Sequence, residues 1–237
     1  MAKKIINIIT IFLVVVSIIV SIKIISIKRV PREQEQKQKQ EEPTKVYEEE
    51  SEPPTSLLES LKTQNPDAIG WIDIPETAIQ YPLMQTIDND YYLQHTFDKE
   101  ENSAGSIYMD YRNDPLFTDQ NTVIYGHDMK NGSMFHNLRY MRKQEYVQKH
   151  PSIFVTVADE ILEYEIFSVY PTEAAYDYRT PNYKEITQYE EFLSRIKKRS
   201  IIDTAIVPDK EDKILTLSTC AYDFEDGRLA VHARLKR

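Results

Sequence analysis

The sequence predicts a mainly β protein, a closed or nearly closed β-barrel with helical insertions, preceded by an N-terminal transmembrane helix. Three observations support this prediction. Beyond residue 56 the chain contains many short runs of β-branched and aromatic residues separated by turn residues, which is typical of all-β folds. Only a few segments there have apolar residues at helical spacing. Residues 5–27 are dominated by Ile and Val.

The N-terminal part divides into an anchor and a stalk. Residues 5–27 follow a short segment over 1–4, contain Lys23 as their one charge, and are long enough to cross a hydrocarbon core of about 30 Å. No clear small-x-small cleavage site follows, so we expect an uncleaved signal-anchor. Both flanks are basic, and charge therefore does not fix the orientation. Residues 28–56 are rich in Glu, Gln and Lys, which predicts a polar disordered stalk, with a short helical stalk as the alternative.

Residues 57–237 suit one compact domain. The chain has a net charge of −9 although its first 32 residues carry basic and no acidic side chains, so this domain is strongly acidic. An acidic domain binds nucleic acid poorly, and we expect no nucleic-acid partner. The single cysteine excludes an intramolecular disulfide and a Cys-rich zinc site. No clear acidic cluster indicates calcium, and we expect no metal and no cofactor.

The first half of the domain contains a helix, four strands and a capped turn. The helix covers Leu57–Thr63 and ends at Asn65-Pro66. Asp88 is expected to cap a helical turn over Asp88–Gln94. The expected strands are β-branched or aromatic runs, and they are Ile69–Ile74, Ala78–Leu83, Gly105–Met109 and Thr122–Tyr125. Pro82 interrupts the second of them, which suits an edge or a bulge.

The second half adds three helices and two strand pairs. Short helices are expected over Met134–Met141 and Lys143–His150, and a longer one over Tyr183–Arg199. The longer helix has apolar residues at helical spacing, namely Ile186, Tyr189, Phe192, Leu193 and Ile196. The first strand pair, Ile153–Val157 with Ile161–Tyr170, forms a hairpin around Asp159. The final pair is Lys213–Thr219 with Arg228–Leu235.

Three side chains at expected strand ends have the chemistry of a cysteine acyl-transfer site. Cys220 ends the Lys213–Thr219 run, Arg228 begins the last strand, and His127 follows Thr122–Tyr125. A hairpin would bring Cys220 and Arg228 within about one or two strand spacings of 5 Å. His127 has to come from a neighbouring strand end, which the sequence does not establish. Taken singly, each residue also fits a structural role: a buried thiol, a turn histidine and a solvated arginine.

These segments resemble a known family. Leu217-Ser-Thr-Cys220, followed by Gly227-Arg228-Leu-Ala-Val231, resembles the active-site hairpin of sortases, the membrane-anchored cysteine transpeptidases of Gram-positive bacteria. Asn121–His127 and then Asn131–Phe135 resemble their catalytic-histidine segment. Class B is favoured by Ile69-Gly-Trp-Ile72, by Asp88–Leu93 and by the helix-like insert at 183–199. The resemblance covers residues 57–237 and the anchor, and it implies a sortase-like catalytic β-barrel.

The resemblance implies a role for each residue. Cys220 would attack the carbonyl of a threonine in a sorting motif near the C-terminus of a surface protein. His127 would protonate the leaving amine and then deprotonate the incoming one, and Arg228 would hydrogen-bond the threonine carbonyl or the oxyanion. The thioester would be resolved by an amine of a peptidoglycan cross-bridge or a lipid-linked precursor. Positions expected to line the motif groove are Asn89, Leu93, Tyr125 and Ser218. We expect a single-pass protein of the cell membrane with an extracellular catalytic domain.

Several alternatives remain open at this stage. His232 is a rival base, ranked below His127 because it lies four residues along the strand from Arg228. Some relatives have an acidic residue directly after the cysteine, where this chain has Ala221, with Asp223 two positions further on. A cysteine peptidase that releases the acyl group to water and a non-catalytic membrane-tethered binding domain are the alternative functions. Cysteine L,D-transpeptidases are a lesser rival, since their His-Gly and Ser-x-Gly-Cys signatures are absent.

Overall fold

The computed structural model describes residues 56–158, 160–221 and 226–237. The expected anchor over 5–27 and the stalk up to residue 55 lie outside the described residues, and so does Asp159. Within the described ranges, no helix combines the length and the apolar character needed to span a bilayer.

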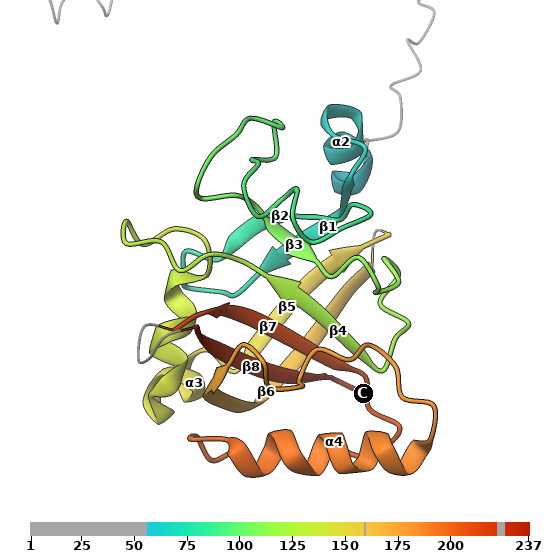
Figure 1. The fold of residues 1–237 in the computed structure, drawn as a ribbon, viewed down its shortest axis with the longest axis vertical. Helices are drawn as coiled ribbons and strands as arrows, with labels where there is room; N and C mark the ends of the chain where they lie inside the picture. Colours follow the sequence, from blue (N-terminus) through green and yellow to red (C-terminus); the bar gives the residue numbers. More distant parts are fainter. Residues whose placement is uncertain (1–55, 159, 222–225) are drawn as a thin grey trace, which may run out of the picture. The chain divides into compact units, whose positions relative to one another are not determined.

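Eight strands of the described chain close into a barrel in the order β1-β2-β3-β4-β7-β8-β6-β5 (Figure 1). The strands are β1 Ala68–Asp73, β2 Gln80–Met84, β3 Ile107–Met109, β4 Asn121–Tyr125, β5 Ser152–Val157, β6 Glu160–Glu173, β7 Ile214–Cys220 and β8 Gly227–Leu235. The barrel predicted from the sequence is therefore confirmed, and its closure leaves no open sheet edge among these strands.

Two of the strand pairs are parallel, and one of them shapes the site. β2 pairs with β3 and β4 pairs with β7 in parallel, while the other neighbours are antiparallel. Because β4 and β7 run in the same direction, their C-terminal ends meet at the same edge of the barrel. The pairing continues to Tyr125, the last residue of β4, opposite Ser218, which lies two residues before Cys220 at the end of β7.

The expected hairpins form with small changes of boundary. Val157 pairs with Glu160 in the β5–β6 hairpin, and β7 pairs with β8 as expected. The second strand begins at Gln80 instead of Ala78 and ends at Met84. Pro82 pairs with Trp71 of β1, whereas β3 pairs with β2 only from Leu83 onward. A missing N–H is tolerated there because Pro82 has a strand partner on one side only.

The described residues form four helices, one before β1 and three in the connections between strands. They are α2 Leu57–Gln64, η1 Phe135–Arg142, α3 Gln144–Lys149 and α4 Ile186–Arg199. A capping box begins α2, since the side chains of Ser56 and Glu59 each bond the other's backbone N–H. The expected helix over Met134–Met141 is a 3₁₀ helix, and Asp88–Gln94 forms bends and a turn instead of a helical turn. Asp88 Oδ1 still accepts from the N–H groups of Asp90 and Tyr91 at 2.9 Å each.

The core has an interior and a flank. The barrel interior is filled by aliphatic side chains from every strand, including Ile72, Leu83, Val155 and Leu217. A second cluster lies where α4 covers the barrel beside β6, and it also includes Ile214 of β7 and Ala230 of β8 (Figure 1). Four of the five expected α4 positions are buried in it, but Ile186 is exposed because it is the first residue of the helix.

Candidate active site

Cys220 and Arg228 lie directly opposite each other at one end of the barrel. They are the last pair of the β7–β8 ladder, and the N–H of Ala221 donates to the carbonyl of Gly227 just beyond them. Cys220 is partly exposed, and its thiol forms no disulfide within the described residues. The expected closeness of thiol and guanidinium is a direct consequence of this register.

The parallel β4–β7 pair brings His127 to the same end. The N–H of Gly126 donates to the carbonyl of Ser218 at 3.3 Å, which continues the ladder to the residue before His127. A Cβ at position 126 would lie 2.4 Å from Cδ1 of Ile107 and 2.8 Å from Cδ2 of Phe135. Glycine therefore lets the chain pass close to the core, and the next side chain reaches Cys220.

The imidazole of His127 is held on both sides. Nε2 lies 2.8 Å from the carbonyl oxygen of Leu93. Since a carbonyl oxygen only accepts, Nε2 carries a proton and donates it, and Nδ1 is the nitrogen left for the hydrogen bond with the Cys220 thiol. The bond with Cys220 and the Leu93 carbonyl raise the pKa of His127, and burial works against them.

The thiol is tuned in the opposite direction. The hydrogen bond from His127 lowers the pKa of Cys220, and the positive charge of Arg228 adds to this effect. Burial and the negative charge of Asp128 raise it, but the net shift is downward. The raised pKa of His127 and the lowered pKa of Cys220 both move the pair toward thiolate and imidazolium, the reactive form of a cysteine nucleophile.

The carbonyls of its own turn hold Arg228. Its Nη1 donates to the carbonyl oxygens of Gly227 at 3.0 Å and Asp226 at 3.2 Å. These bonds fix the guanidinium where β8 begins, beside the thiol. A planar cation with donors in a fixed fork suits an oxygen that gains negative charge.

All seven site residues expected from the sequence line one cavity of about 200 Å³. They are Asn89, Leu93, Tyr125, His127, Ser218, Cys220 and Arg228. The same cavity is also lined by four residues that the sequence analysis did not select, namely Tyr108, Gly126, Arg179 and Thr219. The three catalytic candidates and the four groove candidates thus form one site.

Three of the four groove candidates have a side-chain hydrogen bond to a neighbouring residue. Tyr125 donates its hydroxyl to Asp110 at 2.8 Å, and the Ser218 hydroxyl lies 2.8 Å from that of Tyr178. Asn89 Oδ1 accepts from the N–H of Tyr111 at 3.0 Å. Leu93 acts on His127 through its carbonyl. Sequence reasoning missed the supporting residues because their positions depend on contacts between distant segments.

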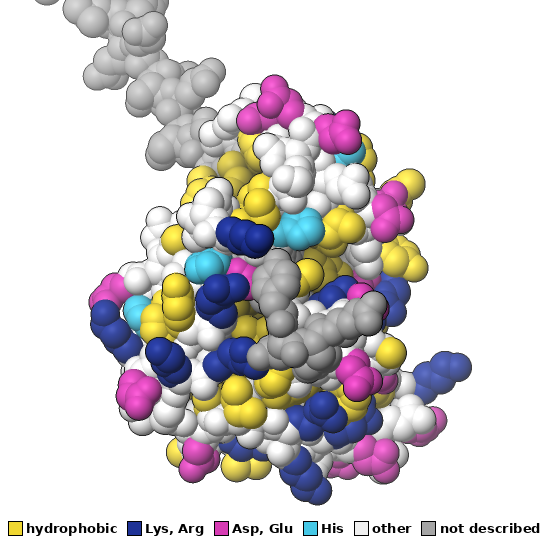
Figure 2. Space-filling view, turned by 60° about the vertical axis from the view of Figure 1, so that its left-hand side comes forward, with side chains coloured by type: hydrophobic (Ala, Val, Ile, Leu, Met, Phe, Trp, Pro, Cys, Tyr) yellow, Lys and Arg dark blue, Asp and Glu magenta, His cyan; other side chains and the backbone are white. Residues whose placement is uncertain are grey.

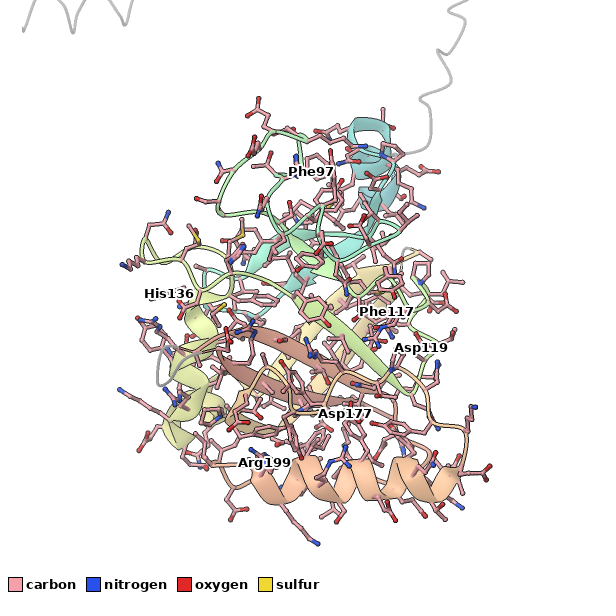
Figure 3. The ribbon with its side chains drawn as sticks, viewed as in Figure 1. Phe97, Phe117, Asp119, His136, Asp177 and Arg199 are labelled. Carbon is pink, nitrogen blue, oxygen red and sulfur yellow. The ribbon has the colours of Figure 1, made fainter. Side chains whose placement is uncertain are left out.

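Asp128 ties the histidine segment to η1. Its carboxylate is buried and accepts from His136 Nδ1 at 2.9 Å and Arg139 Nη2 at 2.6 Å. Phe135 donates its N–H to the carbonyl of His127 at 2.8 Å. His136 lies on η1, on the opposite side of the view from Asp119 (Figure 3). In the sequence, the signal for this contact was an aspartate directly after the histidine that follows a strand.

His232, the rival base, does not reach the cavity. It is fully buried between β7 and β6, with Nδ1 2.8 Å from the Thr216 hydroxyl and Nε2 2.9 Å from the Tyr170 hydroxyl. Burial lowers the pKa of His232 to about 3, so the imidazole is neutral at physiological pH. The structure therefore places His232 away from the thiol, whereas His127 lines the cavity beside it.

Figure 2 shows basic and acidic side chains interspersed on one face of the molecule. Within the described residues, no group of three or more His, Cys, Asp or Glu side chains is placed to hold a metal ion.

Known proteins share this architecture. The sortase domain family matches residues 72–236. Sortase B of Listeria monocytogenes is 40% identical over 180 residues, covering 75% of this chain and 73% of that protein. Sortase B of Staphylococcus aureus is 33% identical over 180 residues, with 75% and 74% covered. Among solved structures, the Staphylococcus aureus sortase B–substrate complex superposes with a TM-score of 0.72 at 33% identity, covering 76% of this chain and 84% of that one. Sortase B of Clostridium perfringens gives 0.71 at 34% identity, covering 75% and 98%.

Proposed function

Since this chain belongs to the sortase family, and within it resembles class B, we propose that Cys220, His127 and Arg228 carry out its transpeptidation. The protein is a cysteine transpeptidase that anchors surface proteins. The observation that best supports the residue assignment is the register that pairs Cys220 with Arg228 while β4 brings His127 to the same thiol.

The acylation step uses the thiolate–imidazolium pair. The Cys220 thiolate attacks the carbonyl carbon of the motif threonine, and the electron pair of the C=O bond moves to oxygen. Arg228 donates to that oxyanion. When the C–N bond breaks, the proton on Nδ1 of His127 goes to the leaving amine, and a thioester remains on Cys220.

The second step returns the proton. An incoming amine attacks the thioester carbon, His127 takes a proton from this amine, and the C–S bond breaks to release the new amide and regenerate the thiolate. The amine belongs to a peptidoglycan cross-bridge or a lipid-linked precursor. Nε2 stays protonated throughout because the Leu93 carbonyl holds it, so a single nitrogen, Nδ1, carries the proton in both steps.

The motif peptide lies in the cavity against the groove residues. Asn89, Leu93, Tyr125 and Ser218 line the same hollow as the thiol, and their partners hold them in place before substrate arrives. A cleft formed in advance spends less binding free energy on ordering side chains. These residues supply the recognition of the motif.

Residues 5–27 anchor the enzyme, and 28–56 hold the catalytic domain 57–237 away from the bilayer. The basis is the composition of the sequence, which is apolar over the first segment and polar over the second. The enzyme is then a single-pass membrane protein whose catalytic domain meets its surface-protein substrates outside the cell.

A peptide library with degenerate motifs tests the proposal. The purified protein is incubated with the library, and the acyl adduct on Cys220 is identified by mass spectrometry, first without and then with an amine acceptor. We expect a thioester in the first case and a new amide in the second. Hydrolysis at the same rate with and without amine would show a peptidase instead. Cys220→Ala serves as the control that forms no adduct.

A further inference from the structure

One wall of the cavity comes from the connection between β6 and α4. Residues 178–183 have no regular secondary structure, yet Tyr178 is fully buried and Arg179 lines the cavity. Asp177, directly before this stretch, lies between the barrel and α4 (Figure 3). A backbone without a ladder or a helix needs other hydrogen-bond partners when it is buried.

Asn121 supplies most of these partners through its side chain and its backbone N–H. It is completely buried at the start of β4. Its Nδ2 donates to the carbonyl oxygens of Tyr178 at 3.2 Å and Thr180 at 3.0 Å, and its backbone N–H donates to that of Pro181 at 2.9 Å. One barrel residue therefore binds three carbonyls of the wall.

Arg112 binds the remaining carbonyl. Its Nη2 donates to the carbonyl oxygen of Arg179 at 2.9 Å. The same guanidinium forms a two-point contact with the buried carboxylate of Asp110, at 2.8 Å for each bond, and Asp110 accepts from Tyr125. Four consecutive carbonyl oxygens, from 178 to 181, thus accept from the barrel.

A directed row of hydrogen bonds orients the Asn121 amide. Thr216 donates to Asn121 Oδ1 at 2.6 Å, because an amide oxygen only accepts. Having used its proton, the Thr216 hydroxyl accepts from Nδ1–H of His232 at 2.8 Å. Nε2 of the neutral imidazole then accepts from the Tyr170 hydroxyl at 2.9 Å. The direction of every hydrogen bond in the row is therefore determined, and His232 carries its proton on Nδ1.

We propose that the row Tyr170–His232–Thr216–Asn121 is a positioning device that fixes residues 178–181 and so sets the peptide-binding wall of the cavity. None of the four side chains lines the cavity, so they act through the wall. If Asn121 were flipped, its oxygen would face two carbonyl oxygens, and the row excludes this orientation. The inference rests on the proposed function for its kinetic consequence only.

Thr216→Val tests the row at its middle. It removes the hydroxyl that connects Asn121 to His232 while keeping a β-branched side chain on β7. Hydrogen exchange is followed by mass spectrometry in peptides covering 178–183. KM and kcat are measured with the library peptide that acylates wild-type Cys220, and thiol reactivity is measured with iodoacetamide. We expect faster exchange in 178–183, a KM raised about tenfold as for the loss of one well-made buried hydrogen bond, and an iodoacetamide rate within about twofold of wild type.

Thr172→Val is the matched control. Thr172 is buried on β6, and its hydroxyl has no hydrogen-bond partner in the described structure, so this variant should match wild type in all three measurements. If Thr216→Val does not fold, Tyr170→Phe removes the hydroxyl that donates to Nε2 of His232 at the other end of the row and should also give faster exchange in 178–183.

The outcomes distinguish the role proposed for the row from the proposed transpeptidase function. A shift of His232 to the Nε2–H tautomer in Thr216→Val, seen in ¹⁵N NMR, together with faster exchange in 178–183 supports the row. Exchange in 178–183 equal to that of Thr172→Val overturns it, as does a KM that stays at the wild-type value. Failure of every peptide to acylate wild-type Cys220 would refute the proposed function, while the exchange and NMR measurements still decide the role of the row.

Discussion

Gly126→Ala tests whether the position of His127 depends on the close passage of the chain before it. The added Cβ would lie 2.4 Å from Cδ1 of Ile107 and 2.8 and 2.9 Å from two ring atoms of Phe135. Ordinary carbon contacts are about 3.5–4.0 Å, so the groups have to separate by roughly 1 Å. Ile107 Cδ1 is the end of a flexible side chain, but the ring is fully buried and Phe135 is bonded to the carbonyl of His127.

Two effects of different size follow. Overpacking of this kind costs about 1–3 kcal/mol of stability, which lowers Tm by about 2–4 °C per kcal/mol in a domain of this length. A displacement of about 1 Å at a catalytic group costs about 10²-fold in rate. We therefore expect kcat/KM to fall by about 10²-fold in a folded protein. The pKa of Cys220 should rise as well, since the hydrogen bond from His127 is the main cause of its lowering.

The assay combines peptide kinetics, thermal melting and the pH dependence of iodoacetamide alkylation. Gly70→Ala is the matched control, because a Cβ there would lie 2.4 Å from the carbonyl oxygen of Thr156, in a strand pair without a residue of the cavity. It should lose stability without changing the thiol titration. A Gly126→Ala protein with wild-type kcat/KM and an unshifted thiol pKa would refute the reasoning.

Three further predictions concern the charges and the boundary. Arg228→Ala should lower kcat by about 10²–10³-fold with a smaller effect on Tm, and Arg228→Lys should recover part of the lost kcat. Near-normal turnover in Arg228→Ala would assign the residue a structural role. His127 lowers the pKa of Cys220 below its ordinary value of 9.0. The wild-type thiol should therefore be alkylated by iodoacetamide at lower pH than the thiol of His127→Ala, whose alkylation rate should rise only toward alkaline pH. His232→Gln should leave this profile unchanged; a similar shift would implicate His232 as the base. Deleting residues 1–53 should leave a soluble enzyme with peptide-cleaving activity, whereas an unfolded product would contradict the domain boundary.

The candidate active-site residues were identifiable from the sequence because they occupy local patterns. Cys220 ends a β-branched run and Arg228 begins the next one, so the hairpin that joins them follows from two neighbouring segments. His127 could be chosen by its position after a strand. Its adjacency to Cys220 could not, because a parallel pair joins β4 to β7 across about 90 residues of chain and leaves no local signal.

Only the tertiary structure distinguishes the two candidate bases. His127 and His232 both lie on or directly beyond a predicted strand, and both are ordinary imidazoles in isolation. Burial removes water from His232 and holds it neutral, whereas the Leu93 carbonyl and the thiol favour the charged form of His127. These environments arise from segments far apart in the chain.

The sequence by itself determined the β-rich composition, the strand ends that carry the thiol, imidazole and guanidinium, and the break between the polar stalk segment and the domain, because each is a property of neighbouring residues. Only the tertiary structure decided the closure of the barrel, the pairing of β4 with β7 and the wall at 178–181. The physical reason is that Asn121, Arg112 and Thr216 act through hydrogen bonds to residues between 57 and 95 positions away. In the sequence, a side-chain amide in a strand looks like any other polar residue, because the carbonyls that it binds come from distant segments that only the fold brings close.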